Sequence, residues 1–222
     1  MRHLCITAGL VAVLALSGCG GSSSARSLQP QPTKPGKYVY NETGELRVNT
    51  AQMKDGPLET VVYEKPVGRD QKVTSKGTLK SSEEVLRYQR DGVFIVSLRS
   101  FVAGGVLEYR PDPPVMFSPA VMTPGKTWAW SMKSVDGKAT LTNESRAVRP
   151  EKVTVKGSRV DTWVIDSVIK LTGPATVNIN VTSWASQERG IVVKGTETTT
   201  GNFGEIPLQG GQDRTLKSLD PA

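Results

Sequence analysis

From Lys37 to the C-terminus, apolar residues come in short bursts separated by turn signals. The bursts are rich in Val, Ile, Trp, Tyr and Phe, and they include residues 38–40, 60–63, 93–96, 128–130, 164–165 and 191–193. Gly-containing turn signals stand between them, at 55–57, 91–92, 124–125, 136–137, 156–158 and 189–190. Strand-length bursts at intervals of about 8–12 residues are typical of antiparallel sheets. The pattern therefore predicts an all-β domain over residues 37–222.

The best helix candidate begins at Ser81, where Ser81–Glu84 resembles a capping box. Only a few residues separate it from the turn at Asp91-Gly92, so we expect a strand there instead.

Two stretches of the chain resemble each other. Pro-Gly-Lys precedes an aromatic burst at residues 35–37 and again at 124–126, and segments 88–96 and 184–193 both carry an aromatic residue, a turn and an aliphatic burst. Either the halves 37–110 and 120–220 are a duplication, or β-proteins reuse such hairpins by chance. In both cases we expect one curved antiparallel sheet or an open half-barrel.

The N-terminus has a different pattern. Arg2 and His3 precede an uncharged, mostly apolar run of 13 residues, Leu4–Leu16. As a helix this run spans roughly 20 Å, too short for a hydrocarbon core of about 30 Å, and its length is typical of a secretory signal. Leu16-Ser17-Gly18-Cys19 matches the bacterial lipobox, in which small residues admit the peptidase and the Cys thiol accepts a diacylglycerol. An ordinary signal peptide with an incidental Cys is the alternative.

The lipobox predicts a signal peptide over residues 1–18 and an exported mature chain that is anchored to the membrane by a lipid on Cys19. Residues 20–36 are rich in Gly, Ser, Pro and Gln, so residues 19–36 are predicted to form the lipidated Cys and a flexible tether. Such a tether spans roughly 20–25 Å on average.

Removal of residues 1–18 also changes the available chemistry. The chain's one His, His3, and one of its two Cys, Cys5, leave with the signal, and Cys19 is acylated. The mature domain then has no His and no free thiol, which excludes His-based triads, disulfides and His/Cys zinc sites. No metal site and no cofactor are predicted.

Net charge is the next constraint. Without Arg2, 27 Lys and Arg remain against 21 Asp and Glu. This excess of positive charge favours anionic lipids or acidic wall polymers as neighbours, although a surface of dispersed charges is the simpler interpretation. No basic block or motif indicates nucleic acid.

One catalytic pattern needs a test. Ser167-Val168-Ile169-Lys170 matches S-x-x-K, which requires Ser and Lys one helical turn apart. Its apolar neighbours predict a strand, where residues three apart point to opposite faces. We therefore expect no enzyme, although a hydrolase that acts through two facing carboxylates stays open.

Four Trp residues could line a cleft or fill a core. Trp128 and Trp130 stand two apart and are expected on one face of a strand. Trp128, Trp130 and Trp184 are the candidate ligand-binding residues. The alternative, that they pack in the core, is the more common use of such residues.

Several motifs carry a family resemblance. Pro124–Trp128, Lys152–Gly157 and Trp184 ahead of Arg189–Val193 resemble the pattern of TapB-like envelope proteins, over roughly residues 120–200. In architecture the chain is also similar to the half-barrels of the LolA and LprG lipid carriers. The resemblance implies an envelope lipoprotein with a concave sheet, but the carriers close their half-barrels with helices and this chain offers no lid helix.

Together these observations predict a membrane-anchored exported lipoprotein that binds, without catalysis, an amphipathic or apolar envelope molecule or a protein partner. A structural lipoprotein with a solid core and no ligand is the alternative.

The anchor is testable. Cys19→Ser removes the thiol that accepts the lipid, so metabolic labelling with a fatty-acid analogue should label the wild type and not the variant. Equal labelling of both proteins would refute the lipobox assignment.

Overall fold

The computed structural model describes residues 29–54, 56–78, 80–102 and 105–222, and every regular element in them is a β-strand. The predicted signal peptide and Cys19 lie outside the described residues. The strands are β1 (Gly36–Val48), β2 (Ala51–Lys54), β3 (Leu58–Tyr63), β4 (Asp70–Lys76), β5 (Ser81–Tyr88), β6 (Gly92–Val102), β7 (Gly105–Tyr109), β8 (Val115–Pro119), β9 (Thr127–Lys133), β10 (Thr140–Val155), β11 (Ser158–Thr172), β12 (Ala175–Ser186), β13 (Ile191–Phe203) and β14 (Ile206–Leu216).

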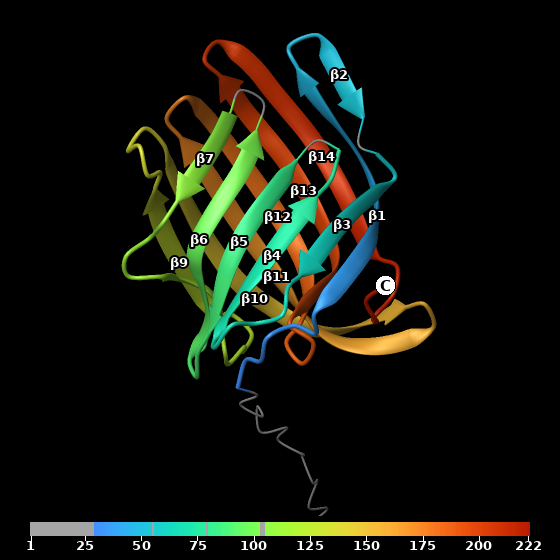
Figure 1. Cartoon of the computed structure of the whole chain (residues 1–222). Helices are drawn as coiled ribbons and strands as arrows, with labels where there is room; N and C mark the ends of the chain where they lie inside the picture. The colour runs from blue at the N-terminus through green and yellow to red at the C-terminus, as the bar shows by residue number, and fades with distance from the viewer. Residues whose placement is uncertain (1–28, 55, 79, 103–104) are drawn as a thin grey trace, which may run out of the picture.

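All fourteen strands belong to one antiparallel sheet. Twelve of them follow one another in the order β7-β6-β5-β4-β3-β1-β14-β13-β12-β11-β10-β9, while β2 pairs with β1 and β8 with β6. The sheet curls until its two ends meet, so the molecule is a nearly closed barrel with one unsealed seam (Figure 1). The all-β prediction is confirmed, as is the strand that begins at Ser81. The sheet curls further than an open half-barrel.

The path divides into two meanders of six strands, β1 with β3–β7 and then β9–β14. The similar segments 88–96 and 184–193 fall at equivalent places, the fourth and fifth strands of each meander. Each of these hairpins also has a register shift, between Val85 and Leu86 and between Trp184 and Ala185. The equivalence is what a duplication would produce, and the duplication stays a prediction.

The seam lies between β9 and the interrupted strand β7/β8. β7 pairs with the upper part of β6 and β8 with its lower part, and between them stand Pro111, Pro113 and Pro114. Proline has no N–H to donate, so this edge does not continue a ladder. The seam is held by a bridge between Tyr109 and Ser134 and by the Trp128 indole, which donates to the Phe117 carbonyl at 2.9 Å.

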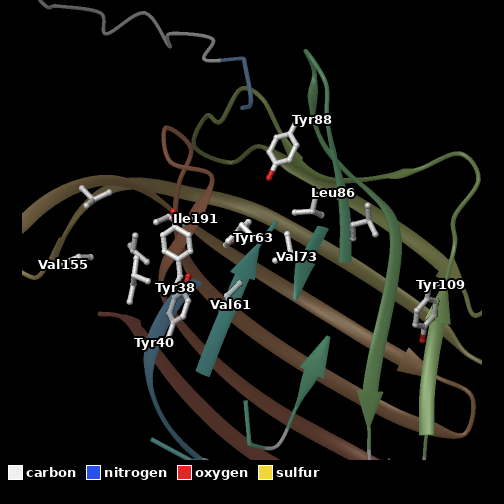
Figure 2. Packing of buried hydrophobic residues seen from close by; sticks show 14 of the residues in the cluster. Tyr38, Tyr40, Val61, Tyr63, Val73, Leu86, Tyr88, Tyr109, Val155 and Ile191 are labelled. Atoms are coloured by element: carbon white, nitrogen blue, oxygen red, sulfur yellow. The ribbon is translucent and has the colours of Figure 1, made fainter. Parts of the chain in front are cut away.

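One end of the barrel is closed by apolar side chains. Tyr38 and Tyr63 meet edge to face with ring centroids 5.5 Å apart, and Val73, Leu86 and Ile191 pack in the same cluster (Figure 2). The turns β3–β4, β5–β6, β8–β9, β10–β11 and β12–β13 and both described chain ends lie at this closed end (Figure 1). Six other turns surround the opposite end, which we call the mouth: β1–β2, β4–β5, β6–β7, β9–β10, β11–β12 and β13–β14.

The chain before β1 belongs to the closed end. Thr33 is buried, its N–H donates to the Gln71 amide oxygen at 2.9 Å, and its carbonyl accepts from the Gln71 amide nitrogen at 2.7 Å. The Thr33 hydroxyl donates to the carbonyl of Gly190, whose φ of 66° suits glycine in that turn. The expected tether over residues 19–36 is therefore too long at its C-terminal end, because Thr33 is part of the fold.

Within the described part of the chain, no helix has the length and hydropathy needed to cross a membrane.

Candidate functional site

Side chains that alternate along each strand define the inner face of the barrel. On β1 the inner positions change in character from the closed end upward: Tyr38 and Tyr40 are buried in the apolar cluster, Glu42 follows, and Leu46 lies near the mouth. On β14 the inner series is Leu216, Arg214, Gln212, Gly210 and Leu208. Charged and polar groups are therefore set between two apolar zones.

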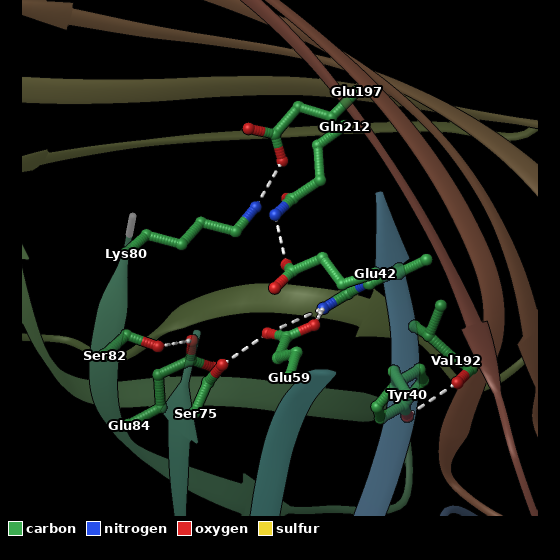
Figure 3. A network of polar contacts seen from close by, with 11 residues as sticks. Tyr40, Glu42, Glu59, Ser75, Lys80, Ser82, Glu84, Val192, Glu197 and Gln212 are labelled. Carbon is green, nitrogen blue, oxygen red and sulfur yellow. Dashed lines mark hydrogen bonds and ion pairs between the residues drawn. The ribbon is translucent and has the colours of Figure 1, made fainter. Parts of the chain in front are cut away.

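The polar positions line up across the sheet and form a polar belt around the interior. Its members are Glu42, Glu59, Ser75, Lys80, Ser82, Glu84, Asn143, Ser145, Ser167, Glu197, Gln212 and Arg214 (Figure 3 shows the part near β1).

The central contact of the belt is an ion pair between Glu59 and Arg214. One guanidinium nitrogen of Arg214 donates to Glu59 Oε2 at 3.0 Å, and the Ser75 hydroxyl donates to Oε1 of the same carboxylate. The Glu59 side chain is only 1% exposed, whereas Arg214 is 28% exposed. The guanidinium also lies over the Tyr40 ring, 5.5 Å from its centroid. A Cβ at Gly195 would come within 3.2 Å of Arg214 Nε, so glycine leaves room for this side chain.

Charge and burial oppose each other at this pair. Burial raises the pKa of Glu59, but the Arg214 charge and the hydrogen bonds from Ser75 and Arg214 outweigh it, and the net pKa is lowered. Burial acts to lower the pKa of Arg214, and the Glu59 and Tyr40 groups raise it overall. Burial raises the pKa of Tyr40 to about 12. At neutral pH the pair is thus ionised beside a neutral phenol.

Two further contacts cross the interior. Lys80, in the β4–β5 turn, donates to Glu197 Oε2 on β13 at 2.7 Å, and the Gln212 amide donates to the Glu42 carboxylate (Figure 3). Lys80 and Glu197 are 40% and 24% exposed although their side chains meet inside the barrel. Water therefore reaches the belt.

Glu84 is the least compensated carboxylate of the belt. Burial raises the pKa of Glu84, and the hydrogen bond from the Ser82 hydroxyl at 3.3 Å and the Arg214 charge lower it only in part. Its neighbour in sequence, Glu83, points to the outer face, where it lies 3.8 Å from Lys72 and 3.5 Å from Arg99.

On the other side of the barrel the belt consists of neutral groups. The Ser145 hydroxyl lies 2.8 Å from the Ser167 hydroxyl and accepts from the Asn143 amide at 2.8 Å. Lys170 is exposed on the opposite face of β11 from Ser167, as the strand period requires, so the S-x-x-K pattern does not bring these two side chains together.

Above the belt the inner face becomes apolar again. We call this zone the apolar lip: Leu46, Val48, Met53, Val177, Ile179, Phe203, Ile206 and Leu208, on β1, β2 and β12–β14. Strands β3–β5 end lower than β1 and β14, so the lip rises above them and is open to the mouth (Figure 1). Met53, Phe203 and Ile206 are exposed.

Two hollows border strands β11–β14. The larger, of about 330 Å³, is lined mainly by outer-face residues of β11–β13, so it lies on the outside of the barrel: Asp166, Val168, Asn180, Thr182, Thr196 and Thr198. The smaller, of about 20 Å³, lies against the inner face, where Val181, Gly195, Glu197, Gln212 and Arg214 line it. The belt therefore borders a small free space at these residues.

The predicted Trp residues do not form one group. Trp128 and Trp130 share the inner face of β9, as expected, with Trp128 near Met122, Ala147 and Ile165 and Trp130 against the main apolar cluster. Trp184 pairs with Val164 and Lys194, donates to Glu151 and lies under the Lys194 ammonium, 4.4 Å from the ring centroid. Like Trp130, it packs against the main apolar cluster, whereas Trp128 lies in the smaller one.

The belt residues were missed from the sequence, although a signal for them existed. Glu42 continues the alternation of Tyr38 and Tyr40, and Glu59 continues that of Val61 and Tyr63. A carboxylate in phase with buried apolar positions indicates an inward-facing charge. No group of three or more His, Cys, Asp or Glu among the described residues is arranged to hold a metal ion.

The fold and site define a nearly closed antiparallel barrel with a polar interior belt. No model of a known protein family matches the chain, and no curated protein matches it. The TapB-like, LolA and LprG resemblances are not confirmed.

Two solved structures are similar at low identity. The hypothetical lipoprotein YmcC from Escherichia coli is 16% identical, with a TM-score of 0.37, over 83% of this chain and 88% of that one. A protein described as exported, with a YmcC-like fold, from Bacteroides fragilis is 12% identical, with a TM-score of 0.41, over 85% of this chain and 97% of that one. With TM-scores below 0.5, neither likeness bears on what this protein does.

Removal of the Arg214 charge tests the ion pair. Arg214→Met leaves Glu59 buried without its cation, so the free energy of unfolding should fall by about 3–5 kcal/mol in urea titrations. Arg214→Met with Glu59→Gln should lose less, because the buried charge is gone. Lys152→Met, which breaks the exposed pair of Lys152 with Asp161, should cost under about 1 kcal/mol. Equal losses at Arg214 and Lys152 would contradict the central role of the pair.

Glu84 makes stability depend on pH. Because its pKa is raised in the folded state, its contribution is fully present below the pKa of the unfolded chain and is lost as the pH rises through the folded pKa. Relative to wild type, Glu84→Gln should therefore gain stability between pH 4 and pH 7.5. Glu83→Gln, on the outer face, should show no such gain. If the difference in unfolding free energy between Glu84→Gln and wild type did not change with pH, the raised pKa of Glu84 would be refuted.

Proposed function

We propose that this protein is a non-catalytic, exported binding protein whose barrel interior takes up an amphipathic molecule. The polar part of the molecule is bound at the belt and its apolar part lies along the lip. The observation that carries the proposal is the order of the inner face, in which a polar belt that water reaches is followed by an open apolar lip.

An amphipathic ligand suits this order better than a purely apolar one. An apolar molecule at the belt would remove water from Glu197, Lys80 and Arg214 and return no hydrogen bonds, which costs several kcal/mol. A polar group placed there replaces the water. The side chains of the lip gain by losing contact with water, about 25 cal/mol for each Å² that is covered.

The state of the belt favours binding over catalysis. The carboxylates of Glu59 and Glu197 are held by Arg214 and Lys80, and the Ser167 hydroxyl by Ser145. The Ser75 and Ser82 hydroxyls do donate to the Glu59 and Glu84 carboxylates, but a carboxylate is a weaker base than the His or Lys that activates a serine nucleophile. The open lip and the hydration of the belt also favour binding over the alternative of a structural lipoprotein with a solid core.

Export and the anchor are part of the proposal and rest on the lipobox at Cys19. The first described residues, around Thr33, leave the domain at its closed end (Figure 1). A lipid on Cys19 would then tether the closed end and leave the mouth free to admit a ligand.

A blocked hollow tests the function. The mature chain (residues 19–222, Cys19→Ser) is titrated into a fluorescent fatty acid and into a fluorescent alkylamine of the same chain length, both below their micelle concentrations. Val181→Trp places an indole in the inner hollow beside Glu197 and Arg214, and it should weaken binding of the probe at least about tenfold, with the melting temperature retained. Glu144→Trp, on the outer face of β10, is the matched control and should bind as wild type does. A wild type that binds neither probe, or a Val181→Trp variant that binds normally, would refute the proposal.

A further inference from the structure

Large apolar side chains are exposed at the mouth. Val135 is 64% exposed, and Met53, Val106, Phe203 and Ile206 are 38–47% exposed. They come from four hairpins, β1–β2, β6–β7, β9–β10 and β13–β14. Hairpin turns are normally polar because their backbone and side chains face water. Exposed apolar residues at four turns of the mouth therefore indicate a surface that is covered in use.

These residues surround the opening rather than form one flat patch. Met53, Phe203 and Ile206 belong to the lip, beside the β1–β14 junction, and Val106 and Val135 stand at the seam. Six strands separate the junction from the seam in each direction around the sheet, so the two groups lie on opposite sides of the mouth. At the seam, the Val135 N–H donates to the Glu108 carbonyl at 2.7 Å, which fixes the two hairpins together.

The charges between these side chains are mainly positive. The exposed basic residues of the mouth hairpins and strand ends are Arg47, Lys54, Lys76, Lys133, Lys138 and Lys170. Among the described residues of the same segments, the exposed acidic ones are Asp136 and Glu205. Asp136 pairs with Lys138, and the partly exposed Glu45 pairs with Arg47, so the positive excess comes from Lys54, Lys76, Lys133 and Lys170.

We propose that the mouth docks on the surface of an anionic lipid bilayer, an interaction that goes beyond binding a single amphipathic molecule. Separate apolar tips that are interspersed with Lys and Arg suit an interface of acyl chains and anionic headgroups, where each tip inserts independently. A protein interface needs instead a contiguous apolar centre with a polar rim. In this orientation the lip opens directly onto the bilayer, and the closed end, where the chain enters, points away from it, so the bilayer at the mouth is a different one from that which holds the lipid on Cys19.

Vesicle binding tests the surface. The mature chain with Cys19→Ser, which keeps every described residue and has no lipid, is sedimented with phosphatidylglycerol vesicles and with phosphatidylcholine vesicles at low salt. We expect binding to the anionic vesicles only, and weaker binding as salt is added. Met53→Ser/Phe203→Ser/Ile206→Ser should bind at least about tenfold more weakly.

Val67→Ser/Val121→Ser is the matched control. Both residues are exposed valines in the β3–β4 and β8–β9 connections of the closed end, with Val67 82% exposed. This variant should bind vesicles as wild type does. No binding by the wild type, or an equal loss in both variants, would overturn the proposal.

A site-specific probe keeps the test independent of folding losses. With Cys19→Ser the mature chain has no Cys, so Phe203→Cys and Val67→Cys each give one position for an environment-sensitive dye. The emission at residue 203 should shift to the blue on anionic vesicles and that at residue 67 should not. A shift at both positions or at neither, or a shift caused by self-association without vesicles, contradicts docking by the mouth. Because Val181→Trp leaves the mouth unchanged, it should still bind vesicles, which separates this result from that of probe uptake.

Discussion

A sheet that closes through twelve consecutive strands encloses more space than its own side chains fill, and the rest of this structure depends on that constraint. At the closed end the space is filled by tyrosines, aliphatic residues and the chain around Thr33. Towards the mouth the filling stops and water enters. Polar groups are then tolerated inside, provided that each is either hydrated or paired.

The belt follows from this division. Glu59 lies where burial is nearly complete and keeps its charge because Arg214 and Ser75 bind it. Lys80 and Glu197 lie where water still reaches them, so each could be hydrated without the other and their pairing adds little stability. Glu84 is an intermediate case. Its pKa is raised because the Ser82 hydrogen bond and the Arg214 charge offset only part of the effect of burial. The charged groups of the belt are therefore oriented by their own contacts.

The seam is the second consequence of closure. The first meander ends in β7 and β8, interrupted by prolines that cannot join a ladder, whereas the second ends in β14, which pairs with β1 from Tyr40 to Val48. The two meanders thus meet at two places. The β1–β14 junction is a continuous ladder, whereas the seam is held by isolated contacts such as the bridge between Tyr109 and Ser134.

The strands and turns, the all-β class and the common face of Trp128 and Trp130 were predictable because they depend on local alternation and on turn residues. Closure, the belt and the contacts of Trp184 with Glu151 and Lys194 were not predictable. They depend on which strands pair and in what register, contacts between residues as distant as Glu59 and Arg214. The tether was misjudged at Thr33 for the same reason, since its polar sequence gives no sign of the Gln71 side chain that binds it. The sequence by itself determined the elements and the faces of each strand. Only the tertiary structure decided what those faces enclose, because an interior exists only once the two ends of the sheet have met.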